Sequence, residues 1–410
     1  MKYILLIGDG MGDTPVPALD GRTPLEAAAT PAMDRLARKS EMLLVRTVPE
    51  GYPPGSDVAN LSLMGYEPEQ CYTGRAPLEA ASLGVDLAPD ETAFRCNLVH
   101  VNRSNNGRLI MVDYSSDHIT TGESRQLIEA LQAECGTSRL RFYPGVSYRH
   151  LLVYRGDLPA GFATVPPHDH SDQEVTGFFR EYWRIEDFPP LLTSAERILA
   201  DHPVNRERQR QGKRTANFIW LWGEGKRPAM VTMEARFGIR GGLISAVDLL
   251  KGLGVFGGLT VIDVPGATGY LDTNYEGKAQ AALDVLDKDD FVLVHVEAPD
   301  ETGHQGLAQE KVRAVADFDR RIVAPIVETM ERRGEPFRLA VTMDHYTPIH
   351  RRTHEDWPVP VFVYDSRFMA APSGRTYTEA NVFAAVRESG RATLSGAAFF
   401  RHFVEREAQR

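Results

Sequence analysis

The sequence predicts an α/β protein: a doubly wound, mainly parallel sheet with an inserted, smaller α+β domain. Short apolar runs alternate with helical segments near both ends of the chain, and several of these runs end directly in Asp or His. Between residues 92 and 188 the pattern changes to short β-like pieces around one helix. At 410 residues the chain is long enough for two domains.

The apolar runs predict buried parallel strands, because a strand covered on both faces reads as a continuous apolar stretch. The first run, residues 3–8 (YILLIG), delivers Asp9 at its carboxyl end, and a helix is expected over residues 31–40. Later runs at 291–297, 339–343 and 359–364 are separated by helical stretches such as 311–328. Strands alternating with helices indicate a sheet with helices on both faces.

The middle of the chain predicts the inserted domain. The pieces AFRCNLVHV, GRLIMVDY, RFYPGV and RHLLVY surround a helix near residues 123–134. We therefore expect the inserted domain over about residues 92–188, with residues 1–91 and 189–410 forming the core. Residues 187–214 are interpreted as a connecting helix, and FIWLWG near Phe218 as the return to the main sheet.

Charge and composition exclude several functional classes. The net charge of −10 argues against a protein that grips a nucleic-acid backbone, which needs a basic face. No stretch approaches the roughly 18 apolar residues of a membrane span, and Asp9 interrupts the N-terminal apolar run too early for a signal peptide. The three cysteines show no CxxC spacing, so neither a disulfide framework nor a zinc ribbon is indicated. We expect a cytoplasmic location, and a homo-oligomer stays open.

Acidic and imidazole side chains gather at one predicted edge of the sheet. Open α/β sheets bind ligands at the carboxyl ends of their strands, where the segments GDGMGD, HVEAPDETGH and TMDH begin or end. His354 precedes the run at 359–364 and can join the same edge. Such a group would repel itself without cations, and mixed carboxylate and imidazole sets suit Mn²⁺, Zn²⁺ or Fe²⁺. The residues expected to converge are Asp9, Asp300, His304, Asp344, His345 and His354.

Ser56 lies in GSD, after a Pro-Pro-Gly turn and at the start of a predicted helix. A serine here serves well as a helix N-cap, and that is one interpretation. Beside metal ions the same hydroxyl becomes reactive, because a divalent cation can lower the pKa of a bound hydroxyl by several units. The second interpretation makes Ser56 a nucleophile.

Five segments together resemble the signature of metal-dependent, 2,3-bisphosphoglycerate-independent phosphoglycerate mutases of the alkaline phosphatase superfamily. They are GDGMGD, PPGSDVANLSLMGY, HVEAPDETGH, TMDH and THEDWPVPVFVY. Longer stretches such as YTGRAPLEAASLGVDLAPDETAFRCN and VPGATGYLDTNYEGKAQAAL resemble the archaeal-type branch, and the likeness spans essentially the whole chain.

The resemblance implies a sheet of alkaline-phosphatase type, a metal-binding core over residues 1–91 and 189–410, and a cap formed by the inserted domain over residues 92–188. It also implies roles for individual residues. One metal ion would be held by Asp9, Ser56, Asp344 and His345, and the other by Asp300, His304 and His354. Ser56 would become phosphoserine while 3-phosphoglycerate and 2-phosphoglycerate interconvert. The expected ion is Mn²⁺, with Zn²⁺, Mg²⁺ or Co²⁺ as alternatives. The expected groups for the substrate carboxylate are Arg75, Arg149 and Lys278.

One segment departs from the archaeal pattern and leaves the substrate open. Where an arginine-rich stretch is expected, this chain reads VDYSSDHITTGES, which resembles a bacterial subgroup proposed as homoserine kinases. His118 would replace an arginine in binding an anion. The alternatives are therefore a homoserine kinase or another phosphotransferase or phosphatase of the superfamily. A nucleotide would need a route other than a P-loop, because GxxxxGK[ST] is absent around Lys278.

Overall fold

The chain forms two compact units. The computed structural model describes residues 1–104, 106–368 and 374–405. The first unit combines Met1–Tyr72 with Ala229–Arg410, and the second is the intervening Thr73–Pro228. Each unit has its own sheet.

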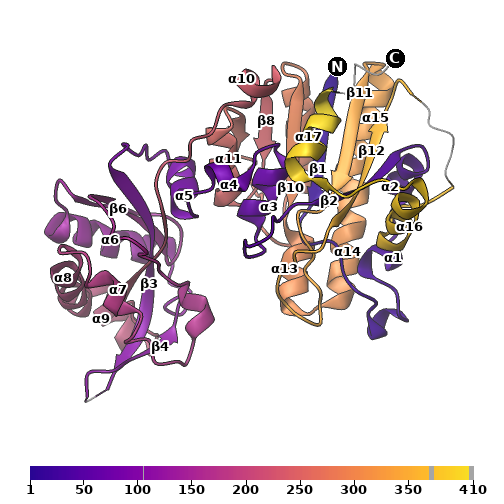
Figure 1. Cartoon of the computed structure of the whole chain (residues 1–410). Coiled ribbons are helices and arrows are strands. Elements are labelled where there is room, and N and C mark those ends of the chain that lie inside the picture. The colour runs from indigo at the N-terminus through magenta and orange to yellow at the C-terminus, as the bar shows by residue number, and fades with distance from the viewer. Residues whose placement is uncertain (105, 369–373, 406–410) are drawn as a thin grey trace. The chain divides into compact units, whose positions relative to one another are not determined.

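An eight-stranded sheet forms the centre of the first unit, in the order β13-β2-β12-β11-β1-β10-β8-β9 (Figure 1). Its strands are β1 (Lys2–Gly8), β2 (Glu41–Arg46), β8 (Gly241–Ile244), β9 (Thr260–Ile262), β10 (Phe291–Val296), β11 (Phe337–Thr342), β12 (Val359–Asp365) and β13 (Leu394–Ser395). β12 runs antiparallel to β11 and β2, and the remaining neighbours pair parallel. The mainly parallel sheet is confirmed.

Helices cover both faces of this sheet. Adjacent residues of a strand point to opposite faces. On β8, Leu243 lies against Gly254 of α11, and its neighbour Gly242 lies against Val285 of α12. The doubly wound arrangement is therefore confirmed. The α-helices of this unit are α1 (Pro24–Ala27), α2 (Pro31–Ala37), α3 (Ser56–Leu63), α4 (Pro68–Cys71), α10 (Met233–Phe237), α11 (Asp248–Phe256), α12 (Tyr275–Leu286), α13 (Ala298–Gln305), α14 (Ala308–Phe318), α15 (Ala324–Arg333), α16 (Glu379–Ser389) and α17 (Gly396–Glu405).

The helix expected over residues 311–328 is interrupted. α14 ends at Phe318, a π-helical turn occupies Asp319–Val323, and α15 follows. The buried carboxylate of Asp319 accepts hydrogen bonds from the backbone N–H groups of Ala32 and Met33, at the start of α2. A contact between segments nearly 290 residues apart cannot be seen in a local periodicity.

Antiparallel β12 matters for the site. β1, β10 and β11 run in the same direction, so their carboxyl ends share one edge of the sheet. Because β12 runs the other way, its amino end, which follows His354, begins at that same edge. Four elements thus deliver polar side chains to one place.

The second unit holds a five-stranded antiparallel sheet in the order β4-β3-β6-β5, with β7 paired to β3. The strands are β3 (Glu91–Arg103), β4 (Leu109–Asp113), β5 (Leu140–Tyr143), β6 (Arg149–Arg155) and β7 (Phe218–Gly225). The helices are α5 (Ala76–Ser82), α6 (Thr121–Cys135), α7 (Phe179–Tyr182), α8 (Phe188–Asp201) and α9 (Pro203–Arg210). The predicted α+β character and the helix near 123–134 are confirmed.

The predicted boundaries of the insert were too narrow. We expected residues 92–188, whereas the compact unit spans Thr73–Pro228. The FIWLWG run does not return to the main sheet, because β7 pairs antiparallel with β3, with Val99 opposite Phe218. Residues 187–214 hold α8 and α9 of the second unit rather than a connection. An apolar run predicts a strand but not its partner, which only long-range pairing decides.

Among the described residues, none of the helices combines the length and the apolar character that crossing a membrane requires.

Candidate metal centre and active site

Asp9 directly follows β1 and is buried. Its backbone N–H still donates to the carbonyl of Val296 (2.9 Å), which continues the pairing with β10 by one residue. The chain then turns at Gly10, whose φ of +57° favours glycine. A Cβ at Gly10 would lie 2.6 Å from Oδ1 of Asp300, so the turn brings the β1 loop against α13.

Asp344 and His345 follow β11 and are both fully buried. Oδ1 of Asp344 accepts from the backbone N–H groups of Gly10 (3.2 Å) and His345 (3.0 Å). Oδ2 accepts from Nδ2 of Asn60 (2.8 Å). These bonds fix the Asp344 carboxylate between two loops and helix α3.

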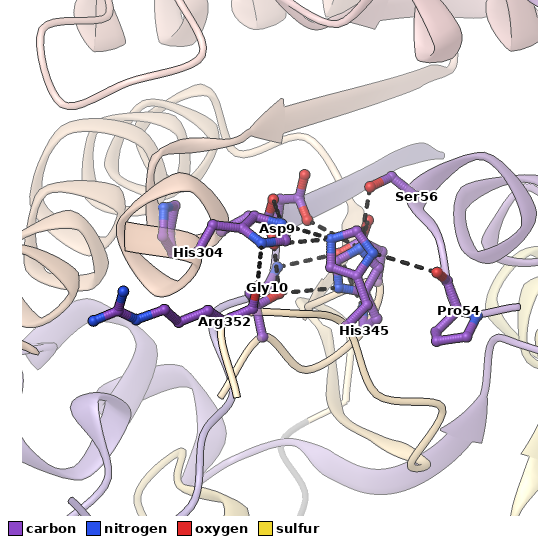
Figure 2. Close-up of polar contacts among 12 residues, drawn as sticks. Asp9, Gly10, Pro54, Ser56, His304, His345 and Arg352 are labelled. Carbon is purple, nitrogen blue, oxygen red and sulfur yellow. Dashed lines mark hydrogen bonds and ion pairs between the residues drawn. The ribbon is translucent and has the colours of Figure 1, made fainter. Parts of the chain in front are cut away.

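Ser56 is the first residue of α3, and Gly55, in an extended conformation, takes the N-cap position. Its Oγ lies 3.0 Å from Nε2 of His345 (Figure 2). Asn60, one turn later, donates to the Ser56 carbonyl (2.8 Å) and ties the first turn of α3 to Asp344. The plain N-cap interpretation of Ser56 is therefore wrong, and its hydroxyl points at the acidic cluster instead.

Asp300, His304 and His354 form the other half of the cluster. Asp300 and His304 lie one turn apart on α13, with Nε2 of His304 3.2 Å from Oδ2 of Asp300. Nε2 of His354 is 3.4 Å from Oδ1 of Asp300 and 2.9 Å from Nε2 of His304. Nδ1 of His304 lies 3.0 Å from the carbonyl oxygen of Arg352 (Figure 2). Nδ1 of His354 lies 3.3 Å from the carbonyl oxygen of Pro54.

Burial and close contact between charged groups shift the pKa values of several residues in the cluster. Burial and the nearby carboxylates of Asp344 and Asp300 raise the pKa of Asp9 well above its usual value. Burial alone would also raise the pKa of Asp300, but His304 and His354 outweigh it and hold that pKa well below the usual value. Burial lowers the pKa of His345 to about 4, so this imidazole stays neutral and keeps a lone pair for a cation or a hydroxyl.

The donor set fits divalent cations. Among the described residues, Oδ1 of the buried Asp9 accepts no hydrogen bond, which is costly unless a cation or donor faces it. The ligand atoms of Asp300, His304 and His354 lie within 4.8 Å of one another, as do those of Asp9, Asp300 and His345. Carboxylate oxygens with imidazole nitrogens suit Mn²⁺ or Zn²⁺.

Comparison with known proteins identifies the family. The model of the family described as 2,3-bisphosphoglycerate-independent phosphoglycerate mutase matches residues 37–205. A Geobacter sulfurreducens protein named "Probable 2,3-bisphosphoglycerate-independent phosphoglycerate mutase" is 51% identical over 391 residues, which cover 95% of each chain. A Methanosarcina acetivorans protein of the same name, without "Probable", is 50% identical over 92% of this chain and 94% of its own. The chain belongs to this family.

A solved member of the phosphoglycerate mutase family has the same architecture. The cofactor-independent phosphoglycerate mutase from Thermoplasma acidophilum is 27% identical, with a TM-score of 0.65, and the match covers 100% of both chains. The family likeness therefore extends over both compact units.

The structure brings together all seven residues that the mutase signature pointed to. They are Asp9, Ser56, Asp300, His304, Asp344, His345 and His354. Their division between two ions, and the role of Ser56 as nucleophile, stay predictions.

The three cationic side chains that we expected to bind the substrate carboxylate lie in different surroundings. Arg75 and Arg149 belong to the second unit, and Arg149 is exposed. Lys278 belongs to the first unit and is fully buried, with Nζ donating to the carbonyl of His295 (3.1 Å). Burial lowers the pKa of Lys278 to about 8. This buried position indicates that Lys278 stabilises β10 and does not contact a substrate directly.

Three polar residues of the cluster were missed. Asn60 stands at i+4 from Ser56, a spacing that could have drawn attention to it. Thr347 donates its hydroxyl to Oδ1 of Asp300, and its Oγ1 lies 3.3 Å from Nδ1 of His345. His295, on β10, places Nε2 3.1 Å from Oδ2 of Asp9. His295 and Asn60 lie inside the segments HVEAPDETGH and PPGSDVANLSLMGY, whereas nothing in the local sequence points to Thr347.

A cationic and aromatic cluster lies within the second unit. The guanidinium of the buried Arg95 stacks on Trp222 (4.1 Å to the ring centroid) and pairs with Glu79 (3.1 Å). Burial first, and then the charges of Arg75 and Arg149, lower the pKa of Arg95 against the opposing effect of Glu79. Gathered cations of this kind fit an anionic ligand.

His168 lies in the same cluster. Its ring lies edge-on to Trp222 and Tyr114, with centroids 5.5 and 6.1 Å away. Burial lowers the pKa of His168 in spite of Asp169, and the charges of Arg95 and Arg75 add to that effect.

The segment that departs from the archaeal pattern forms a tight turn in the second unit. Ser116, Asp117 and His118 all have positive φ, of 50°, 58° and 46°. Oxygens of Asp113 accept from the backbone N–H groups of Ser115 (2.8 Å) and Asp117 (2.7 Å) and hold the turn. A non-glycine residue in the left-handed region raises the conformational free energy by about 1–2 kcal/mol, and backbone strain of this kind is concentrated at functional sites.

Proposed function

We propose that this protein interconverts 3-phosphoglycerate and 2-phosphoglycerate through a phosphoserine at Ser56, without 2,3-bisphosphoglycerate. One observation carries the proposal. In a chain half identical to curated mutases, the Ser56 hydroxyl lies 3.0 Å from His345, inside a buried group of carboxylates and imidazoles. A non-enzymatic protein has no need of a hydroxyl in that place.

Seven residues of the first unit would hold two divalent ions, for which we propose Mn²⁺. Asp9, Ser56, Asp344 and His345 would bind one ion, and Asp300, His304 and His354 the other. When bound, the ions would lower the pKa of the Ser56 hydroxyl and neutralise charge on the transferring phosphoryl group.

Ser56 would carry the covalent chemistry. Its Oγ attacks the phosphorus of 3-phosphoglycerate, the bond from phosphorus to the C3 oxygen breaks, and the proton lost by Ser56 balances the one gained by glycerate. The C2 hydroxyl of the retained glycerate then attacks phosphoserine, releases Ser56 and gives 2-phosphoglycerate. Asn60 and Gly10 keep Asp344 in place throughout, through their bonds to its two oxygens.

The second unit is proposed to act as a cap that recognises the substrate carboxylate. A mutase must retain glycerate and exclude water, since hydrolysis of phosphoserine would make the enzyme a phosphatase. Arg75 and Arg149 would supply positive charge suited to a carboxylate, beside Arg95, which is paired with Glu79. His168, whose pKa is lowered, would contribute a neutral ring. This match of charge supports the substrate proposal.

The test is a coupled assay on metal-stripped protein. Mn²⁺ is restored, and formation of 2-phosphoglycerate from 3-phosphoglycerate is followed through enolase without added 2,3-bisphosphoglycerate. We expect Mn²⁺-dependent turnover that Ser56→Ala abolishes. Ser62→Ala is the matched control, because Ser62 is a buried serine on the same helix whose Cβ lies beside Gly396 of α17. Mass spectrometry of acid-quenched enzyme should find phosphate on Ser56.

Other outcomes identify the alternatives. Release of inorganic phosphate and glycerate, without 2-phosphoglycerate, would indicate a phosphatase. Consumption of ATP with homoserine and no mutase turnover would leave the serine and metal centre in place and overturn the substrate. Full turnover by Ser56→Ala would overturn the mechanism.

A further inference from the structure

Lys311 on α14 is a lysine with no exposed surface, outside the group of proposed metal ligands. Its ammonium group has three N–H donors, and three acceptors surround it. They are the carbonyl of Gly12 (3.0 Å), Oδ2 of Asp13 (2.9 Å) and the carbonyl of Thr347 (2.8 Å). The site described above does not use this side chain.

These acceptors lie on the two loops that carry proposed ligands. Gly12 follows Asp9 by three residues, and Thr347 follows His345 by two. The loops also touch directly, through bridges from Met11 and Gly12 to Tyr346. Lys311 therefore connects the loop after β1 with the loop after β11 from the side of a third element, α14.

Asp13 extends the same connection. Its carboxylate is buried and accepts from the backbone N–H groups of Thr14 (2.9 Å) and Ile349 (3.1 Å) as well as from Lys311. A buried ion pair is weak evidence for stability, because desolvating two charges offsets most of their attraction. The geometry of the pair is more informative than its energy, because Asp13 connects the loop after β1, the loop after β11 and α14 at one point.

Thr347 connects Lys311 with two of the proposed metal ligands. Its hydroxyl donates to Asp300, and its Oγ1 lies 3.3 Å from Nδ1 of His345. Asp300 and His345 belong to different proposed ion sites. A shift of the Thr347 backbone would therefore move a ligand of each ion.

We propose that Lys311 is a positioning residue: its ammonium group holds the loops after β1 and β11 at the separation that two divalent ions need. It sets the affinity of the centre for metal without touching metal or substrate. This inference rests on the proposed metal centre but not on the identity of the substrate. Partners of metal ligands commonly change metal affinity about 10–100-fold when removed.

The test measures Mn²⁺ binding by calorimetry on metal-stripped protein, alongside the melting temperature of the metal-free form. Lys311→Met leaves Asp13 buried without its cation, so this variant is expected to be unstable. Lys311→Met/Asp13→Asn removes both charges and keeps the net charge of the wild type. We expect the double variant to regain much of the lost melting temperature and to bind Mn²⁺ at least 10-fold more weakly than the wild type.

Arg338→Met is the matched control. Arg338 is another buried cation, at the start of β11, and it donates to the carbonyls of His402 (3.2 Å) and Phe403 (2.6 Å). Its loss should lower the melting temperature and leave the Mn²⁺ affinity unchanged. An equal loss of affinity in this control would show general destabilisation and overturn the proposal, as would wild-type affinity in the double variant.

Low-temperature electron paramagnetic resonance gives a second measurement. The spectrum of two coupled Mn²⁺ ions in the wild type should change toward that of uncoupled ions in Lys311→Met or, if that variant does not fold, in the double variant. An unchanged spectrum counts against the proposal. Wild-type protein that binds Mn²⁺ but lacks mutase turnover would refute the proposed substrate alone. Wild-type protein that binds no Mn²⁺ would overturn the metal centre and the role of Lys311 together.

Discussion

Proton binding at His304, a proposed metal ligand, would compete with metal binding. Its ring nitrogen Nε2 lies 3.2 Å from a carboxylate oxygen of Asp300. Burial alone would lower the pKa of His304, but the hydrogen bond and charge of Asp300 outweigh it and raise that pKa to about 9. In the metal-free protein at neutral pH, this imidazole therefore carries a proton that a cation must displace.

We predict that Mn²⁺ affinity rises with pH up to about 9. Below the pKa of His304, binding releases one proton from this residue, so affinity should fall by up to about tenfold for each unit of decreasing pH. Calorimetric titrations between pH 6.5 and 9, in buffers of different ionisation enthalpy, count the released protons. His304→Asn is expected to bind more weakly and to lose this part of the slope. An unchanged slope in the variant would assign the proton to another group.

At the scale of elements, the turn after β1 packs against the start of α13 and the loop after β11. Gly10 has positive φ, and an added Cβ would meet Oδ1 of Asp300 at 2.6 Å and its Cα at 2.9 Å. Gly21 has positive φ as well, but a Cβ added there would have no atom within 4 Å. Comparing alanine substitutions at these two glycines therefore separates the effect of backbone strain from the effect of a collision with Asp300, a proposed metal ligand.

We predict that Gly10→Ala weakens Mn²⁺ binding and Gly21→Ala does not. Both substitutions place alanine in the left-handed region, which costs about 1–2 kcal/mol of stability. Only Gly10→Ala also pushes Asp300 away, so its stability loss should be larger and its Mn²⁺ dissociation constant at least about tenfold higher. Chemical denaturation and calorimetric titration measure the two effects. Equal Mn²⁺ affinities in the two variants would contradict the packing argument.

The residues proposed for metal binding and for substrate recognition belong to different compact units of the molecule. All seven proposed metal ligands belong to the first unit, whereas Arg75, Arg95, Arg149 and His168 belong to the second. Metal binding and substrate recognition should therefore respond to different substitutions.

We predict that Arg149→Ala raises KM for 3-phosphoglycerate about tenfold or more and leaves Mn²⁺ affinity unchanged. A hydrogen bond to a charged group contributes about 1.5–3 kcal/mol, and the exposed Arg149 has little structural role to lose. Arg197→Ala is the control, because Arg197 forms an exposed ion pair with Glu134 in the same unit. Steady-state kinetics at saturating Mn²⁺ measures the effect. A normal KM in Arg149→Ala would remove this arginine from the substrate site.

The sequence by itself determined the parts of this protein that depend on local pattern. Continuous apolar runs predicted β1, β10, β11 and β12, since a strand buried on both faces must be apolar throughout. The Asp and His residues at the ends of these strands predicted the cluster, because parallel strands present their carboxyl ends at one edge.

Only the tertiary structure decided which strands pair and which buried groups support the cluster. The FIWLWG run predicted a strand correctly, but its pairing with β3 in the second unit depends on a partner more than 110 residues away. Lys311, Thr347 and Asn60 likewise act through contacts with residues distant in the chain. Long-range packing decides which side chains are buried and which partners they contact. It produces no periodic pattern in the sequence next to the residue.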